Sequence, residues 1–532
     1  MKGLFSVTSF LYFSITTVFA QNVKISSTEE YTNELPNVYW TSVLGQDNSG
    51  YYLLREYGSV SDPSIVLEKY SPSLKLLFSS DIEATSGTIN DSKLHRLTEM
   101  SNGKIYIFLE GWNKEQQQNS FLVKEVNEDG TLNKNEILLE TEPSSGQMKS
   151  ANYSVRFSPD GSKLLVLTQK PFEKGGKEKI RLQVFNTSDF SSIWKKDLTL
   201  ENESVRYPRN EIIVDNNGVA YLFKDDKLSL KEHIYSLQTI SENQSKIELI
   251  NLKNYNVGQK KLMINHSGNL LICGTLVPPG GADTDWQGIW YFQANSSGAV
   301  LQNKVEPIGR NVLSLLTSQK NAEKEGYVLQ NFVLKDILLE SNGDVLFLTE
   351  EQSESKSIVG ESTPPKYEYS LLYGNALVIS FDDAGNTNWA TTIDKKQEEK
   401  TMDPKKTFGS FAYQLKNDKL YVTWNYMNIF SDPPLNKFRY WIDLNGSKIN
   451  IDNIFGKEAH YPTLLTVIDE NGNFQHRDRT FSSLPLEDIQ KPNAFRMAID
   501  PNIFFATDNG IIILSRMPGV ETKRYKFNTI NY

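Results

Sequence analysis

Short polar turns alternate with short apolar runs along most of this chain. Each turn is built mainly from Asn, Asp, Ser, Gly and Pro, and four to six mostly apolar or β-branched residues follow it. Such turns supply the positive φ angles or local side-chain hydrogen bonds that tight hairpins need. The eight copies are Asp47-Asn48-Ser49-Gly50, Ser101-Asn102-Gly103, Ser158-Pro159-Asp160-Gly161, Asn216-Asn217-Gly218, His266-Ser267-Gly268, Ser341-Asn342-Gly343, Lys416-Asn417-Asp418 and Asp500-Pro501-Asn502.

A second turn follows each of these first turns, and the whole unit recurs about every 65 residues. Two turns in a unit predict two hairpins, that is, four short strands. The second turns are Ser71-Pro72, Asp129-Gly130, Ser188-Asp189, Glu242-Asn243, Ser297-Gly298, Ala384-Gly385, Asn471-Gly472 and Pro518-Gly519.

Repeated four-strand units predict an all-β fold, a single β-propeller in which each blade packs against its neighbours. The alternative is a set of two or three β-sandwiches, but the constant order of the turns favours the propeller. The direct count gives eight blades, and the weak last copy leaves seven open. Val23 and Ile25 are candidates for a strand that completes the last blade.

One repeat carries a family resemblance. Residues 157–166, Phe-Ser-Pro-Asp-Gly-Ser-Lys-Leu-Leu-Val, resemble the blade signature of TolB-like and WD40-like propellers. The export signal described next, the Asn/Lys-rich turns and the aromatic strands also resemble exported envelope propellers of Bacteroidota, one of which is the Plug component of the type IX secretion translocon. The resemblance implies a propeller fold and a periplasmic location beside an outer-membrane complex.

The first twenty residues have the pattern of an export signal. Lys2 precedes an apolar stretch, and Val18 and Ala20 give the small-x-small pattern for cleavage before Gln21. Ser and Thr dilute the stretch too much for a membrane anchor, which needs about 18–25 strongly apolar residues. We therefore expect a signal peptide at 1–20, an N-terminal arm at 21–36 and the propeller at 37–532. We expect the protein to be exported to the periplasm, with secretion to the cell surface as the alternative.

The amino-acid composition limits which classes of molecule the protein is expected to bind. The chain has 56 Lys and Arg against 65 Asp and Glu, a formal net charge of −9, and one cysteine, Cys273. A net negative charge disfavours nucleic acid as a binding partner, because its phosphates are negative too. A single cysteine excludes an internal disulfide framework. The segment Asn311–Glu325 breaks the strand pattern, because Val312, Leu315 and Leu316 have helical spacing, and it predicts a short amphipathic helix capped by Asn311 and ended by Gly326.

The long insertions all fall between the second and third strands of a unit, so we expect them on one face. They are 111–119, 170–177, 278–288, 352–369 and 425–437. Aromatic residues in and beside them are candidate binding residues, with packing between blades as the alternative for Trp424 and Trp286. The candidates are Trp424, Tyr426, Phe430, Phe438, Trp441 and Trp286.

Acidic residues recur near the same face. Glu110, Asp225 and Glu350 each lie seven residues after the turn glycine of their unit, which makes them weak candidates for a cation site. Asp283 and Asp285 are candidate paired carboxylates for glycoside hydrolysis. The five histidines lack metal-site spacing, and no nucleophile elbow or phosphate loop occurs. We expect no cofactor and no catalytic constellation.

The sequence is compatible with two main functions, and with a ligand-binding sensor domain as a third that would need a fused signalling segment. The first is a non-enzymatic subunit of an envelope complex that binds a protein partner, an outer-membrane β-barrel or a secretion component, through the face with the long loops. The alternative is a secreted hydrolase or lyase that acts on polysaccharide through loop carboxylates.

Overall fold

The protein was analysed as a computed structural model of the whole chain. The structure describes residues 24–32, 35, 38, 40–59, 62–82, 86–87, 89, 95–146, 150–360, 365–402, 407–425, 441–444, 447–450, 463–477, 498–516 and 524–532. The predicted signal peptide and the turn Pro518-Gly519 lie outside these residues. No helix in the described residues is long and apolar enough to cross a membrane.

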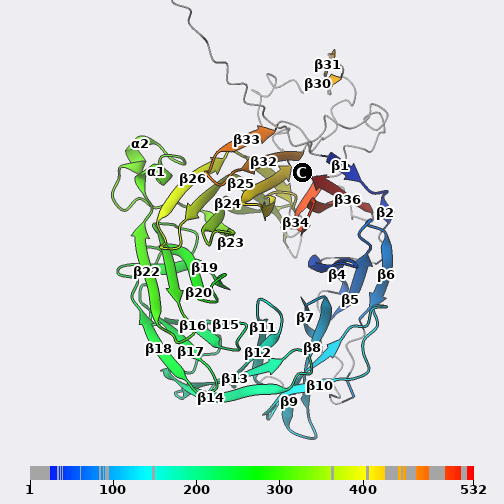
Figure 1. Cartoon of the computed structure of the whole chain (residues 1–532), viewed down its shortest axis with the longest axis vertical. Helices are drawn as coiled ribbons and strands as arrows, with labels where there is room; N and C mark the ends of the chain where they lie inside the picture. Colours follow the sequence, from blue (N-terminus) through cyan, green and yellow to red (C-terminus); the bar gives the residue numbers. More distant parts are fainter. Residues whose placement is uncertain are drawn as a thin grey trace, which may run out of the picture.

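The described residues form eight antiparallel sheets arranged in a ring, which are the blades of a β-propeller (Figure 1). In each blade the strands follow one another from the centre outward. Blades 1 and 2 contain β3 (Trp40–Asp47), β4 (Gly50–Ser59), β5 (Asp62–Tyr70) and β6 (Leu76–Asp81), then β7 (His95–Ser101), β8 (Lys104–Asn113), β9 (Gln118–Glu125) and β10 (Ile137–Pro143). Blades 3 and 4 contain β11 (Asn152–Phe157), β12 (Lys163–Gln169), β13 (Lys177–Asn186) and β14 (Ser192–Glu203), then β15 (Asn210–Val214), β16 (Ala220–Lys227), β17 (His233–Ile240) and β18 (Ser245–Ile250).

The remaining blades keep this order with short additions. Blades 5 and 6 contain β19 (Asn256–Ile264), β20 (Leu270–Val277), β21 (Gly288–Ala294) and β22 (Val300–Pro307), then β23 (Phe332–Leu339), β24 (Val345–Val359), β25 (Lys366–Phe381) and β26 (Thr387–Ile393), with β27 (Gln397–Thr401) beside β25. Blade 7 contains β28 (Ala412–Lys416), β29 (Lys419–Asn425), β32 (Thr463–Ile468) and β33 (Phe474–Arg477), and the pair β30 (Trp441–Leu444) and β31 (Ser447–Asn450) lies between β29 and β32 in sequence.

The N-terminal strand closes the ring. Blade 8 contains β34 (Ala498–Thr507), β35 (Gly510–Arg516) and β36 (Arg524–Asn531), and its fourth strand is β1 (Lys24–Ser27), which pairs with β36. The short strand β2 (Tyr31–Thr32) also pairs with β36. The prediction that Ile25 adds a strand to the last blade is therefore confirmed, as is the count of eight blades.

Apolar residues pack between consecutive blades all around the ring. Eight clusters of buried side chains each join two neighbouring blades, and one of them joins blade 8 to blade 1 through residues such as Phe527 and Tyr70. Each fully buried aliphatic or aromatic side chain contributes about 1.5–3 kcal/mol. Apolar burial between blades is thus what holds the four-stranded units together.

Most of the predicted turns lie between strands, as expected. At the turn of blade 7, Asn417 and Asp418 both have positive φ, at 50° and 55°, which is the geometry of a two-residue hairpin turn. The prediction for the last blade is wrong. The segment 500–502 lies inside β34, where the pairing register shifts between Ile499 and Phe504, and the turn comes later, at residues 508–509. A β-bulge with turn-like residues explains the error.

The predicted helix is replaced by two shorter ones, α1 (Arg310–Leu313) and α2 (Gln319–Ala322). Gly309 and Ser318 precede them, so Asn311 is not the cap. Gly326 does end the segment with a positive φ of 67°. Val312 and Leu313 are buried against blades 5 and 6, so the helical segment packs on the ring.

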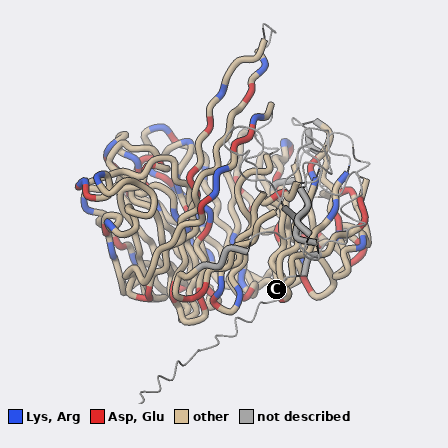
Figure 2. Tube along the Cα trace, turned by 90° about the horizontal axis from the view of Figure 1, so that it is seen from above, with Lys and Arg blue, Asp and Glu red and all other residues tan. Residues whose placement is uncertain are grey.

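The ring has two faces. The turn face carries the first and third turns of each blade, and the loop face carries the connections between the second and third strands. The predicted insertion 352–369 forms mostly strand, because β24 and β25 extend past the blade as a long hairpin that rises from the ring (Figure 2).

Candidate functional site

The three acidic positions predicted from the repeat lie on the second strands of their blades, near the loop face. Glu110 is on β8, Asp225 on β16 and Glu350 on β24. Their surroundings differ, because the side chains that each meets come from neighbouring strands and blades. Of the three, Asp225 has surroundings that suggest proton transfer.

Asp225 and His233 form a closely bonded pair in blade 4. The imidazole Nδ1 of His233 lies 2.6 Å from Oδ1 of Asp225, and each side chain is only 7% exposed. The pairing of β16 with β17 explains the contact: Lys227 lies opposite His233, so Asp225 is its diagonal neighbour on the same face of the sheet. The carboxylate therefore fixes the orientation of the imidazole. Nε2 has no hydrogen-bond partner among the described residues.

Arg209 bonds to the other oxygen of this carboxylate. Its Nη1 donates to Oδ2 of Asp225 at 3.1 Å, and the Arg209 carbonyl accepts from the Asp225 amide. Arg209 directly precedes the innermost strand of blade 4, so the guanidinium lies where the chain enters that blade. About half of the Arg209 side chain is exposed, which leaves part of its fork of donors open to solvent.

Tyr235 lies beside His233 and points toward blade 5. The two rings are stacked at 5.8 Å, and the Tyr235 hydroxyl accepts a hydrogen bond from the amide of Val257 at 2.8 Å. Burial, together with the charges of Asp225 and Asp283, raises the pKa of Tyr235. Asp283, one of the predicted carboxylates, is therefore close enough for its charge to act on this ring.

The opposite side of β16 is bound to blade 3. Lys224 forms ion pairs with Glu178, which is fully buried on β13, and with Asp226 at 2.8 Å. Asn210 donates to the other oxygen of Glu178 at 2.6 Å. Burial and the nearby Glu178 and Asp225 charges raise the pKa of Asp226, although Lys224 opposes the shift. This cluster fixes the end of β16 that carries Asp225.

An exposed patch of aromatic and basic side chains adjoins Arg209. Tyr207 is 88% exposed and Phe172 is 41% exposed. The guanidinium of Arg206 lies over the Phe172 ring, 5.5 Å from its centre. One residue, Pro208, separates Tyr207 from Arg209, so their Cα atoms are at most about 7 Å apart. The patch and the Asp225–His233 pair are thus parts of one region.

The predicted binding aromatics lie elsewhere, and two of them are in the core. Trp286 is buried in the cluster between blades 5 and 6, and Trp424 in the cluster between blades 6 and 7. Both side chains serve packing between blades, the alternative left open by the sequence. Trp441 lies on β30, and Tyr426, Phe430 and Phe438 lie outside the described residues.

The other two cation candidates already have protein partners. Glu350 is fully buried beside the ammonium group of Lys395, and the Ser410 hydroxyl donates to it at 2.7 Å. Asn119 donates to Glu110 at 3.1 Å. Within the part of the chain that the structure describes, no group of three or more His, Cys, Asp or Glu side chains could hold a metal ion.

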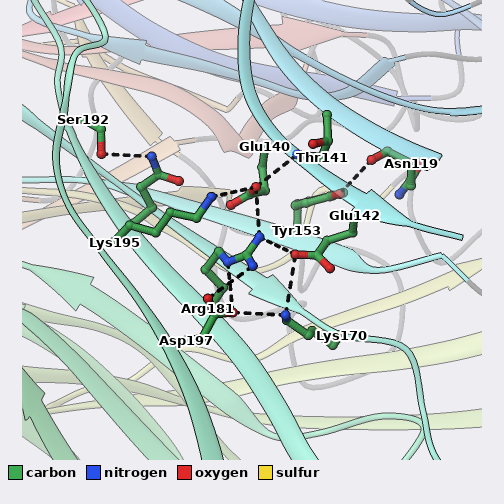
Figure 3. Close-up of polar contacts among 11 residues, drawn as sticks. Asn119, Glu140, Thr141, Glu142, Tyr153, Lys170, Arg181, Ser192, Lys195 and Asp197 are labelled. Atoms are coloured by element: carbon green, nitrogen blue, oxygen red, sulfur yellow. Dashed lines mark hydrogen bonds and ion pairs between the residues drawn. The ribbon is translucent and has the colours of Figure 1, made fainter. Parts of the chain in front are cut away.

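A second charged network joins blades 2 and 3 (Figure 3). Arg181 on β13 pairs with Glu140 at 3.1 Å, with Glu142, and with Asp197 at 3.0 Å. Lys195 and Lys170 pair with these same carboxylates. Three acids thus face three bases, and this balance is typical of a structural clamp.

The sequence pattern does not predict His233, Arg209 or Tyr207 as site residues. A metal-site spacing rule for histidines cannot detect the pair, because Asp225 and His233 are eight residues apart on strands joined by a connection. Treating β16 and β17 as an antiparallel hairpin and searching diagonal neighbours would have found the pair.

Comparison with known proteins supports the fold alone. No protein-family model matches the chain, and no curated protein matches it. The chain is similar in structure to the β-propeller domain of the Trilobed protease from Pyrococcus furiosus, with 9% identity and a TM-score of 0.36 over 84% of this chain and 99% of that one. It is also similar to the acylaminoacyl peptidase of Pyrococcus horikoshii, with 9% identity and a TM-score of 0.37 over 92% of this chain. A further similar structure is prolyl oligopeptidase B of Galerina marginata, with 8% identity and a TM-score of 0.36 over 91% of this chain.

This chain spans 60% and 56% of those two longer proteins. The neighbours named here are peptidases or part of one, which contradicts the prediction of a non-enzymatic envelope subunit. That prediction is withdrawn, and its enzyme alternative is kept.

Proposed function

We propose that this protein is an exported enzyme that cleaves polysaccharide, with His233 as its proton-transferring group. The observation that carries the proposal is the Asp225–His233 pair, whose Nε2 lacks a partner among the described residues, beside the exposed patch of Tyr207, Arg206 and Phe172. A histidine oriented through one ring nitrogen by a carboxylate can accept or donate a proton at the other. Export rests on the pattern of the first twenty residues.

The patch has the chemistry to bind an acidic sugar chain. Exposed aromatic rings such as Tyr207 and Phe172 stack on the apolar faces of sugar rings. The guanidinium groups of Arg206 and Arg209 bind carboxylates through paired hydrogen bonds. A polysaccharide that contains uronic acids presents both features. The two arginines therefore favour this substrate class over a neutral glycan.

One base beside a guanidinium favours β-elimination over hydrolysis. Arg209 would neutralise the uronate carboxylate, which makes the adjacent carbon more acidic. His233 Nε2 would take the proton from that carbon. The electron pair then forms a carbon–carbon double bond as the bond to the glycosidic oxygen breaks, and that oxygen takes a proton from water. Asp225 is a positioning residue here, since it holds the imidazole.

The test is a degradation assay on polygalacturonate, alginate and neutral glucans. We expect cleavage of a uronate polymer with ultraviolet absorbance from the unsaturated product. His233→Gln should lower kcat about 100-fold or more, and Tyr207→Ala should raise KM about ten-fold. His266→Gln is the matched control, because His266 lies at the turn face, where it contacts the backbone carbonyl of Glu340.

The outcomes separate the parts of the proposal. New reducing ends without absorbance would mean hydrolysis, and they would reject elimination while keeping the acid–base centre if His233→Gln is inactive. Cleavage that survives His233→Gln in a folded variant would reject this site. The absence of cleavage on every polymer would reject the enzyme proposal.

A further inference from the structure

The hairpin of β24 and β25 leaves one strand edge without a partner. Within blade 6, β24 lies between β23 and β25, but β23 pairs with it only as far as Glu351. The backbone amide of Gln352 donates to the carbonyl of Asn331 at 2.7 Å, and from Ser353 to Val359 β24 pairs with β25 alone among the described strands. This part of the hairpin rises away from the ring (Figure 2). Its free edge presents a row of backbone donors and acceptors.

The outer part of the hairpin is a two-stranded ribbon without a third strand among the described residues. β27 pairs with β25 at residues 369–373, and nearer the tip than Tyr369 the hairpin has two strands among the described residues. Ile358 and Val359, near the tip, are 65% and 43% exposed. A two-stranded ribbon in water is marginally stable, and further strands stabilise it. A further strand paired with the free edge of β24 would therefore stabilise the hairpin.

The sequence of this edge is complementary to itself. Residues 353–357 are Ser-Glu-Ser-Lys-Ser, a palindrome in which only the charge changes sign about Ser355. If two copies pair antiparallel about Ser355, Glu354 of each copy faces Lys356 of the other, and serines face serines. Opposite charges directly across an antiparallel pair attract, while like charges repel. A two-fold axis makes both contacts at once.

Lys356 is already ordered in a position that suits this contact. Its Nζ lies 3.6 Å from the centre of the Tyr367 ring and 5.4 Å from that of Tyr369. These rings hold the side chain on the ribbon face that also carries Glu354, because the two residues are two positions apart on one strand. Part of the entropy of ordering a lysine is thus already lost before association.

We propose that the edge of β24 from Ser353 to Ser357 pairs with the same edge of a second copy of this chain. The two hairpins then form a four-stranded sheet across a two-fold axis. Five residues on each side make a small interface, and small interfaces are weak. The dimer therefore forms reversibly with concentration.

Charge substitutions test the pairing directly. Sedimentation velocity of the full-length protein over a range of concentrations should show a monomer–dimer equilibrium. Glu354→Lys alone places lysines opposite lysines, and Lys356→Glu alone places glutamates opposite glutamates. Each should raise the dimer Kd about ten-fold or more. The double swap Glu354→Lys with Lys356→Glu restores both opposite pairs and should recover most of the affinity.

Glu368→Lys is the matched control, because it changes a charge on the other strand of the same hairpin, and it should leave the Kd unchanged. Circular dichroism and the thermal midpoint verify folding of each variant. A protein that stays monomeric at all concentrations overturns the proposal. So does a dimer that both single variants leave intact, or one that the double swap fails to restore.

Discussion

Glu340 shows how a single side chain can make stability depend on pH. It follows β23 at the turn face and is 3% exposed, and the imidazole of His266 contacts its backbone carbonyl. Burial, together with the charges of Asp344 and Asp418, raises the pKa of the Glu340 carboxyl to about 7. Folding therefore favours the protonated acid. Its contribution to stability is complete below the unfolded-state pKa and is lost as the pH rises through about 7.

Replacing this acid by its neutral amide should remove the dependence. Glu340→Gln should match the wild type near pH 4.5 and exceed its free energy of unfolding by up to about 3 kcal/mol at pH 8. Urea denaturation at several pH values measures this difference. Glu201→Gln, at an exposed glutamate paired with Lys177, should keep the wild-type slope between pH 5 and 8. Equal slopes for Glu340→Gln and the wild type would show that this carboxyl does not titrate in that range.

Sequence reasoning at this scale found positions but not partners. Glu110, Asp225 and Glu350 were predicted as equivalent acids, and they do lie on second strands. Their chemistry differs because Asn119, His233 and Lys395 meet them from other strands or connections. A one-dimensional repeat fixes where a residue lies along its strand. It contains no information on which side chain faces it.

At the scale of elements, the charged network of Figure 3 joins β10 of blade 2 to β13 of blade 3. Glu140 and Glu142 are almost fully buried, with side chains 4% and 7% exposed. Removing the guanidinium that pairs with both would leave two desolvated carboxylates with only lysines at the rim. Arg181→Met should therefore lower the free energy of unfolding by about 3 kcal/mol.

Lys177 on the same strand provides the control. It pairs with Glu201 at 2.6 Å, but both side chains are at least half exposed. Lys177→Met should cost less than about 1 kcal/mol, because exposed ion pairs are screened by water. Urea midpoints of the two variants measure the difference. Similar losses in both would mean that burial of Glu140 and Glu142 does not govern the energy of the network.

Secondary-structure elements were predicted correctly where the residues of the element itself determine its conformation, as in the turns. The turns before β8, β12 and β16 each contain a glycine with positive φ, which the sequence pattern anticipates. The predicted loop at 352–369 became strand because residues on each side of its tip pair with each other, and a search for turns cannot detect that pairing. The helical segment divided in two because Ser318 caps a second helix after α1.

At the scale of the whole molecule, the ring closes through a junction of distant residues. The buried Arg55 and Glu68 of blade 1 pair at 2.7 Å, and Tyr70 donates to Glu68 at 2.7 Å. The hydroxyls of Tyr70 and Tyr525 lie 2.7 Å apart, and the Arg55 guanidinium covers the Tyr525 ring. Blades 8 and 1 are therefore held by a polar cluster as well as by apolar packing.

The strand pair β1–β36 completes this closure with residues from the two ends of the described chain. Ser27 lies opposite Asn528, and their side chains are 2.6 Å apart. The next pair, Thr28 and Phe527, is hydrogen-bonded through the Thr28 amide, so Ser27 and Asn528 form a non-hydrogen-bonded pair. The Cα atoms of such pairs are about 4.5 Å apart, which a disulfide can bridge.

A disulfide at this position should lock the ring. Ser27→Cys with Asn528→Cys closes a loop of nearly the whole chain, so oxidation should raise stability by up to about 5 kcal/mol, and reduction should reverse the gain. Thermal midpoints with and without dithiothreitol measure the effect, and each single cysteine variant is a control. The native Cys273 is buried, and burial raises its pKa, so it does not compete. If the disulfide forms without changing the thermal midpoint, unfolding begins elsewhere in the ring. Separation of β1 from β36 would then not be the step that limits thermal stability.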